Sequence, residues 1–226
     1  MTDQPAAEST TLIEIDLWSD LVCPWSWMAK RRLEAAVAAF ERPTDVSVRL
    51  RAYELDPELP VGGAVPVSEH LALRYAAGDG GGDVLTARVS DAAADDDLRF
   101  DWDRAVRAST FDAHRLCALA LELGGPALQS AAVERFHAAH FSEGLAIDDH
   151  RVLLRAAEEC GLDERRVAAV LAGDDYADVV RADEQAARAL GVTSVPVVVA
   201  NGLAALGGAR TAEDYLALLR GVATHG

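Results

Sequence analysis

The chain has 226 residues, of which 50% are hydrophobic, and a formal net charge of −16 at pH 7. This length suffices for one large domain or two smaller ones with a sizeable buried core. The acidic charge argues against binding to nucleic acid or anionic lipid, because both depend on Lys and Arg. No run approaches the roughly 20 apolar residues of a membrane-spanning helix, so we expect no membrane association. Residues 1–11 are polar and lack the apolar stretch of a secretory signal, which predicts a cytoplasmic location.

The N-terminal part predicts a strand, a helix and a second strand. Residues 12–17 and 46–53 alternate apolar and polar side chains, as strands do. Between them, Pro24 favours the start of a helix, because its missing N–H needs no partner there. Apolar residues then recur at helical spacing until Pro43 ends the pattern.

The middle of the chain predicts a block of helices. After a Pro/Gly-rich stretch at 60–66, residues 68–77 have helical spacing and residues 78–82 are rich in Gly. Helical periodicity then dominates from about residue 104 to 190 and predicts about four or five helices. The expected helix ends are Gly124–Gly125, Gly161 and Gly173, and the expected starts are Asp148, Asp163 and Asp174.

The C-terminal part predicts a hairpin and a final helix. Asn201 and Gly202 separate two apolar runs, and both tolerate the positive φ that a tight hairpin turn needs. Thr211 followed by Asp214 is typical of a helix N-terminus.

This order of elements predicts an α/β fold, a thioredoxin-like fold with an inserted all-helical domain. We expect residues 1–60 to form the first part of the thioredoxin-like domain, residues 61–173 the helical insertion domain, and residues 174–226 the second part. Residues Ile13 and Val198 should then lie in one sheet.

Cys23 is the residue on which the functional prediction rests. At a helix start, unpaired backbone N–H groups and the helix dipole stabilise a thiolate, which predicts a pKa below the ordinary value of about 8.5. An unpaired cysteine is also commonly a small buried hydrophobe, so its position alone leaves both interpretations open. Cys117 and Cys160 lie on apolar helical faces, which favours burial for both. No two of these cysteines have the spacing of a zinc pair or a disulfide framework.

Five separated motifs resemble the DsbA family of thiol-disulfide oxidoreductases, in particular its FrnE-like branch, and they occur in the family's order. They are residues 18–25 with 30–34, then 51–57, 109–116, 140–147 and 191–196.

The resemblance implies a role for each residue of the site. Cys23 matches the nucleophile, and Val195–Pro196 matches a cis-proline loop whose preceding backbone pairs with an extended peptide or with glutathione. Pro24 and Trp25 complete the implied substrate-binding residues, and an exposed Trp25 would form an apolar wall. The implied partner is a disulfide-containing protein or a small thiol. The resemblance implies no resident cofactor, with glutathione or another low-molecular-weight thiol as a co-substrate.

Ser26 departs from the family pattern. The family's usual site is C-x-x-C, whereas this chain has Cys23, Pro24, Trp25 and Ser26 in these positions. A second thiol normally resolves the mixed disulfide, so an external thiol would have to do so here. Ser26 would instead hydrogen-bond the thiolate. The resemblance therefore implies a disulfide oxidoreductase or isomerase that acts through one cysteine, with Cys23 and Ser26 as its catalytic residues.

Two other functions stay open at this point. One is a glutathione-dependent isomerase or transferase of the kappa and hydroxychromene-carboxylate isomerase type, although those proteins usually carry serine at the position of Cys23. The other is a binding module that keeps the groove and has lost catalysis.

Other features favour structural interpretations. His137 and His140 share a helical face with apolar residues, which predicts a buried seam and no metal site. The acidic run 95–97 indicates a solvated loop, and the Gly-rich residues 78–82 lack the Lys of a phosphate-binding loop. Arg210 would meet a glutathione carboxylate or, in the interpretation we prefer, solvent.

Overall fold

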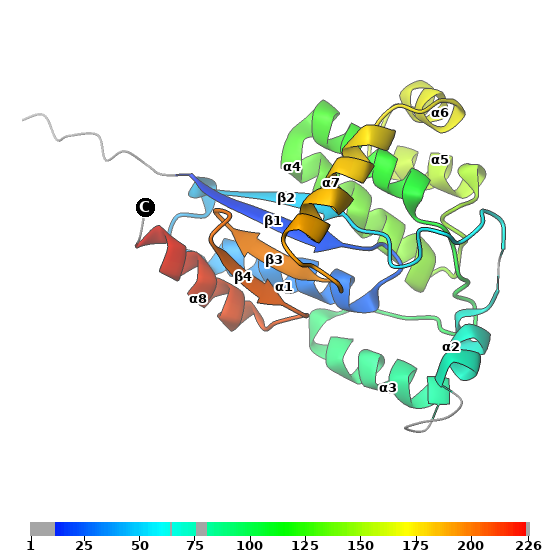
Figure 1. The fold of residues 1–226 in the computed structure, drawn as a ribbon, viewed down its shortest axis with the longest axis horizontal. Coiled ribbons are helices and arrows are strands. Elements are labelled where there is room, and N and C mark those ends of the chain that lie inside the picture. Colours follow the sequence, from blue (N-terminus) through cyan, green and yellow to red (C-terminus); the bar gives the residue numbers. More distant parts are fainter. Residues whose placement is uncertain (1–11, 64, 76–80, 225–226) are drawn as a thin grey trace, which may run out of the picture.

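The computed structural model describes residues 12–63, 65–75 and 81–224. Three sequence-based interpretations extend outside these residues: the polar start at 1–11, most of the Gly-rich turn at 78–82, and the end of the helix expected at 68–77. The remaining elements are arranged as a sheet, with helices around it (Figure 1).

The described sheet has four strands in the order β2-β1-β3-β4. Strand β1 pairs in parallel with β2 and antiparallel with β3, and Leu17 lies opposite Val198. The prediction that Ile13 and Val198 share one sheet is therefore confirmed, although 144 residues separate β2 from β3 along the chain. The strands are β1 (Ile13–Ser19), β2 (Val46–Ala52), β3 (Val197–Ala200) and β4 (Ala204–Gly207).

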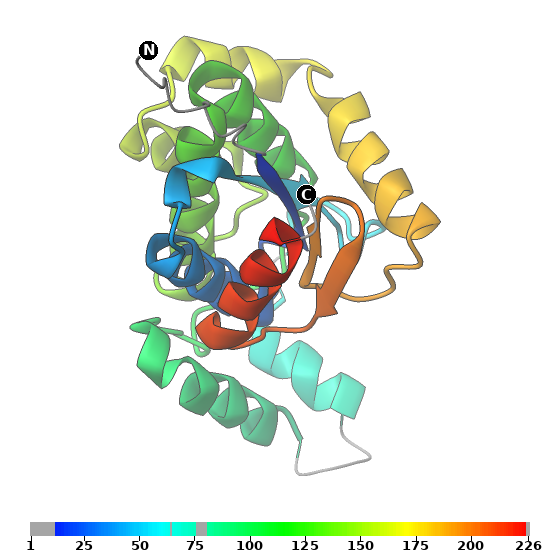
Figure 2. The same cartoon turned by 90° about the vertical axis from the view of Figure 1, so that its left-hand side faces the viewer.

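Helices cover both faces of the sheet. Helices α1 (Pro24–Ala39) and α8 (Ala212–Ala223) pack against each other on one face (Figure 2), where buried side chains of β1 meet them. On the other face, Trp18 packs with Val199 and with Ala187 of α7 (Ala177–Ala189). The fold class expected from the sequence, a thioredoxin-like fold with a helical insertion, is confirmed.

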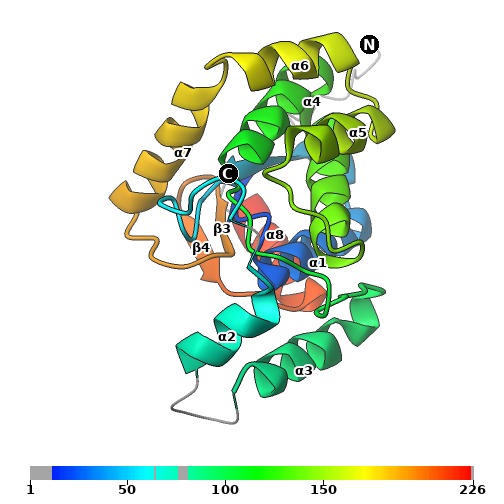
Figure 3. The ribbon, with the colours of Figure 1, turned by 90° about the vertical axis from the view of Figure 1, so that its right-hand side faces the viewer.

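The insertion between β2 and β3 is helical. Its elements are α2 (Val67–Tyr75), α3 (Gly81–Ala93), α4 (Phe111–Phe141), α5 (His150–Glu159) and α6 (Glu164–Ala172), which precede α7. Short 3₁₀ turns occupy Pro43–Asp45 and Ala94–Asp96. In Figure 3, α2 and α3 lie side by side at one end of the molecule, and α5 and α6 lie at the other.

The edge strand β2 is closed by a side chain of the insertion. The Gln129 amide of α4 accepts a hydrogen bond from the Leu50 N–H at 3.0 Å and donates one to the Leu50 carbonyl at 2.9 Å. One side chain thereby satisfies both outward-facing backbone groups of Leu50, which would otherwise present an open strand edge.

Local signals in the sequence placed several boundaries correctly. The Asn201–Gly202 turn has positive φ at both residues and joins β3 to β4, and Thr211 forms a capping box with Asp214 at the start of α8. Asp163 caps α6 as expected, whereas the cap of α5 is Asp149 in place of Asp148. Helix α7 starts after Tyr176, two residues later than the expected Asp174.

The long helix α4 is a core helix with a kink. By length and composition it is apolar enough to cross a membrane. However, its buried residues pack in the same core as β1 and α1, and the backbone leaves helical geometry at Gly124 and Gly125, where the sequence predicted a helix end. In the acidic run at 95–97, Asp95 and Asp97 are exposed as expected, whereas the partly buried Asp96 carboxylate pairs with the Arg32 guanidinium at 2.7 Å.

Candidate active site

Cys23 lies at the junction of the sheet and the first helix. The chain leaves β1 through a turn in which the Cys23 N–H donates to the Asp20 carbonyl at 3.1 Å. Cys23 is the N-cap residue of α1, and Pro24 follows at the first helical position, as the sequence predicted. Because Pro24 lacks the N–H that would go unpaired there, the sequence itself fixes the helix start beside the sulfur.

The cis-proline loop reaches Cys23 from the other end of the chain. The Val195–Pro196 peptide bond is cis. The Cys23 thiol donates a weak hydrogen bond to the Val195 carbonyl, with Sγ and the oxygen 3.6 Å apart. Only 5% of the Cys23 surface is exposed to solvent. The structure therefore brings together Cys23 and the cis-proline loop, as the resemblance implied, but the thiol is buried and hydrogen-bonded to that loop.

Burial controls the acidity of this thiol. It raises the pKa of Cys23 to about 11, and the hydroxyl and backbone hydrogen bonds of Ser26 counteract only part of this effect. Ser26 is fully buried, and its Oγ accepts a hydrogen bond from the Asp20 N–H at 3.3 Å. The expectation of a pKa below the ordinary value is therefore wrong, because desolvation of the thiolate outweighs the helix N-terminus.

Asp20 is a buried acid close to Cys23 that was not predicted from the sequence. Asp20 is 0% exposed, and its Oδ2 accepts a hydrogen bond from the Leu55 N–H at 2.7 Å. Its Oδ1 lies 3.5 Å from Nε2 of His114 on α4, and neither atom has a hydrogen-bond partner in the described part of the chain. The Asp20 charge contributes to raising the pKa of Cys23. Its position in the turn before Cys23 was the available signal, whereas nothing in the sequence connects His114 to it.

Two more buried titratable groups surround this pair. Burial raises the pKa of Glu54 to about 7, although the Arg181 guanidinium, 2.6 Å away, opposes the shift. Burial lowers the pKa of His140 to about 4, so its imidazole is neutral at physiological pH. The titratable groups beneath the sulfur are therefore shielded from solvent, which disfavours their charged forms.

A cavity of about 500 Å³ opens beside Cys23. We call it the insertion-side cavity, because residues between β2 and β3, in α2, α3, the loops beside them and the end of α4, build most of its wall. Trp25 is partly exposed and lines it, as expected for an apolar wall. Residues that represent its different walls are Asp20, Cys23, Trp25, Val89, Trp102 and Phe141.

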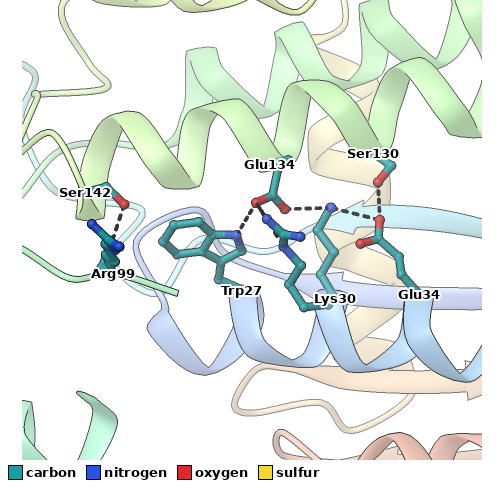
Figure 4. A network of polar contacts seen from close by, with 8 residues as sticks. Trp27, Lys30, Glu34, Arg99, Ser130, Glu134 and Ser142 are labelled. Atoms are coloured by element: carbon teal, nitrogen blue, oxygen red, sulfur yellow. Dashed lines mark hydrogen bonds and ion pairs between the residues drawn. The ribbon is translucent and has the colours of Figure 1, made fainter. Parts of the chain in front are cut away.

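A polar and aromatic contact joins α1 to α4 behind the site (Figure 4). The Trp27 indole N–H donates to Glu134 at 2.9 Å, and the buried Lys30 ammonium pairs with the same carboxylate at 2.9 Å. The Trp27 ring also stacks on His137, with ring centroids 5.6 Å apart, and on Phe141. This contact fixes the helix that carries Cys23 against the insertion, which explains the burial of Trp27.

Cys117, His137 and His140 are buried, and Cys160 is partly buried. Cys117 is buried in the main core, and burial raises its pKa well above the ordinary value. The Cys160 thiol donates to the Ala157 carbonyl at 3.0 Å. His137 and His140 are buried, as the seam interpretation predicted. Within the described ranges, no group of three His, Cys, Asp or Glu side chains is arranged to hold a metal ion.

The Arg210 side chain binds the backbone of its own loop. Its Nε donates to the Gly207 carbonyl at 2.8 Å, and the side chain is exposed. This position agrees with the preferred surface interpretation.

A thioredoxin-like sheet, a cysteine at the start of the first helix and a cis-proline facing that cysteine define a thioredoxin-like protein with a helical insertion. Residues 14–218 match the family model described as the DSBA-like thioredoxin domain. The chain therefore belongs to the DSBA-like thioredoxin family, whose general activity is thiol-disulfide oxidoreduction. A search of curated protein sequences gave no match to this chain.

Solved structures support the same assignment. A probable DsbA oxidoreductase from Streptomyces coelicolor is 34% identical, with a TM-score of 0.84 over 92% of this chain and 88% of that chain. The cytosolic disulfide reductase DsbM from Pseudomonas aeruginosa, solved with glutathione, is 20% identical, with a TM-score of 0.66 over 92% and 98% of the two chains. A 2-hydroxychromene-2-carboxylate isomerase is 18% identical, with a TM-score of 0.65 over 94% and 95%. The last two show the fold alone.

Proposed function

We propose that this protein is a thiol-disulfide oxidoreductase or isomerase of the FrnE-like branch that works through the single thiol of Cys23. The observation that carries the proposal is the contact of 3.6 Å between the Cys23 sulfur and the Val195 carbonyl of the cis-proline loop. Ser26 stands where the family's second cysteine would be. The mixed disulfide is therefore released by an external low-molecular-weight thiol, glutathione or an equivalent, in a reducing cytoplasm.

Both half-reactions are thiol-disulfide exchanges. Cys23 Sγ attacks one sulfur of the substrate disulfide, the substrate S–S bond breaks, and the thiol proton passes to the leaving thiolate. Cys23 is thereby oxidised to a mixed disulfide, and one substrate sulfur is reduced. An external thiolate then attacks the substrate sulfur of the mixed disulfide and forms a new disulfide with that half of the substrate. The bond to Cys23 breaks, and Cys23 leaves as a thiolate and takes up a proton. The hydroxyl of Ser26 stabilises the Cys23 thiolate in both half-reactions, because its hydrogen bond lowers the pKa of Cys23.

The substrate contacts follow from the same geometry. The Val195 carbonyl now accepts the thiol hydrogen bond, so an incoming peptide or glutathione backbone would replace that contact. Pro24 and Trp25, on the first turn of α1, flank the sulfur and would contact the substrate. The proposed partner is a disulfide-containing protein or a small thiol, with no resident cofactor.

Mass spectrometry after treatment with glutathione disulfide tests the proposal. We expect one glutathione on Cys23 of the folded protein, none on Cys117 or Cys160, and none at position 23 in the Cys23→Ser variant. Because burial raises the pKa of Cys23, the adduct should form faster at about pH 9 than at neutral pH.

Two results would contradict it. An unmodified Cys23 in the folded protein, together with modification after unfolding, would favour a binding module. Catalysed transfer of glutathione to an electrophile, without exchange, would favour the isomerase or transferase class.

A further inference from the structure

Cys23 is approached from two different sides. On one side the Val195 carbonyl lies 3.6 Å from its sulfur. On the other side is the insertion-side cavity, whose described lining includes Cys23 and Trp25 but neither Val195 nor Pro196. The cavity is therefore a separate space from the backbone contact of the cis-proline loop.

The size of this cavity suits a small molecule. Its volume of about 500 Å³ lies within the range of about 300–1,000 Å³ that is typical of small-molecule sites. Cys23 is only 5% exposed, so a disulfide approaching from this side must enter the cavity before the sulfurs meet. A disulfide held rigidly in a folded protein surface would not reach so deeply buried a sulfur.

The wall of the cavity is mainly apolar. Trp25 and Trp102 present aromatic surfaces, and Val89 of α3 and Leu59 add aliphatic ones. Apolar walls with a few polar groups are the usual composition of small-molecule sites, in which the apolar contacts supply affinity. The body of the ligand should therefore be apolar.

One side chain of the lining supplies an uncommitted positive charge. Arg88, on the exposed side of α3, forms no ion pair with any residue that the structure describes, whereas Arg107 pairs with Asp56. The protein as a whole carries a charge of −16 and repels anions at long range. A preference for an anionic ligand would therefore have to come from this local arginine.

We infer that the insertion-side cavity binds the small-molecule substrate of Cys23, a low-molecular-weight disulfide with a mainly apolar body and a carboxylate facing Arg88. The inference rests on the proposed function. Cys23 Sγ forms a bond to one sulfur of this disulfide, the ligand S–S bond breaks, and the Cys23 proton goes to the departing thiolate. Cys23 is oxidised to the mixed disulfide, and the departing half is reduced to a thiol.

Three disulfides of similar size test the charge preference: 3,3′-dithiodipropionate, bis(2-hydroxyethyl) disulfide and cystamine. Each rate constant for mixed-disulfide formation at Cys23 is divided by the rate constant of 2-mercaptoethanol, which carries no other charge, with the same reagent. We expect the anionic reagent to exceed cystamine by about fivefold or more, the scale of one exposed ion pair. Arg88→Gln should remove this preference. Arg165→Gln, which changes the same charge at an exposed position on α6, should keep it.

A cavity-filling variant tests the location. Leu59→Trp places an indole in the cavity and should slow 3,3′-dithiodipropionate by about fivefold or more, whereas Leu203→Trp, at an 89% exposed position, should not.

The inference and the proposed function fail in different ways. If cystamine reacts as fast as the anion, or if Leu59→Trp leaves the rate unchanged, the cavity is not the substrate site. The proposed function then still stands if Cys23 forms a mixed disulfide with insulin. If Cys23 of the folded protein reacts with none of the three reagents and not with insulin, both fail.

Discussion

Replacing Asp20 with Asn should make Cys23 more acidic. The buried Asp20 carboxylate is one of the groups that raise the pKa of Cys23 to about 11. Burial is the largest cause of this shift, and the Asp20 charge is a smaller one. One pKa unit corresponds to about 1.4 kcal/mol. We therefore expect Asp20→Asn to lower the pKa of Cys23 by up to about one unit, less than the whole shift. Asn retains the oxygen that accepts the Leu55 N–H, so the turn should persist.

The change in reaction rate is smaller than the change in thiolate concentration. At a pH below both pKa values, the thiolate fraction should rise by up to about 10-fold, but a less basic thiolate is also a weaker nucleophile. With a Brønsted coefficient of about 0.4–0.5, a decrease of one pKa unit gives a net increase in alkylation rate of about threefold. Ser26→Ala should have the opposite effect, because it removes a hydrogen bond that lowers the pKa of Cys23.

The assay is the rate of alkylation of Cys23 by iodoacetamide as a function of pH, with thiolate ultraviolet absorbance as a second measure of the pKa. Glu158→Gln is the matched control, because it removes the same charge at an exposed position on α5. A wild-type midpoint below about 8.5 would refute the argument from burial. An unchanged midpoint in Asp20→Asn would refute the role given to the buried acid.

Three further predictions concern turnover and stability. Ser26→Cys places a thiol one turn along α1 from Cys23. Insulin reduction driven by dithiothreitol should then rise well above that of the slow wild type. If the variant forms a disulfide between Cys23 and the introduced thiol but gains no activity, the binding module is favoured. Between about pH 9 and 11, the unfolded chain loses the Cys23 proton while the folded protein keeps it, so folding stability should fall by up to about 3 kcal/mol. Urea unfolding in Cys23→Ser should show a shallower fall, and an equal fall would contradict the shift. Gln129→Ala leaves the Leu50 N–H and carbonyl unpaired, so the free energy of unfolding should fall by about 1–3 kcal/mol and hydrogen exchange at Leu50 should become faster. Unchanged exchange would show that the strand edge does not need this side chain.

Local rules account for the parts of the fold that the sequence predicted. The turn at Asn201–Gly202, the capping box of Thr211 and the helix start at Pro24 each depend on neighbouring residues, so they are readable in one short stretch. The pairing of β1 with β3 is not local, and it followed from the order of elements and the resemblance together.

The same local rules do not predict the environment of Cys23. A helix N-terminus predicts an acidic thiol, but the burial that reverses this prediction comes from residues far away in the chain, including the loop at Val195. The approach of His114 to Asp20 likewise depends on how the insertion docks on the sheet. The insertion-side cavity arises between the first turn of α1 and the pair α2 and α3, which no periodicity in either segment reveals.

The mixed disulfide trapped during turnover tests the central claim most directly. Protein turning over insulin with glutathione is quenched with acid and an alkylating agent, and the state of each cysteine is determined by mass spectrometry. One-thiol chemistry predicts a population in which Cys23 is joined to glutathione or to an insulin cysteine, while Cys117 and Cys160 are alkylated as free thiols. An intramolecular disulfide from Cys23 to Cys117 or Cys160, or continued turnover by Cys23→Ser, would contradict it.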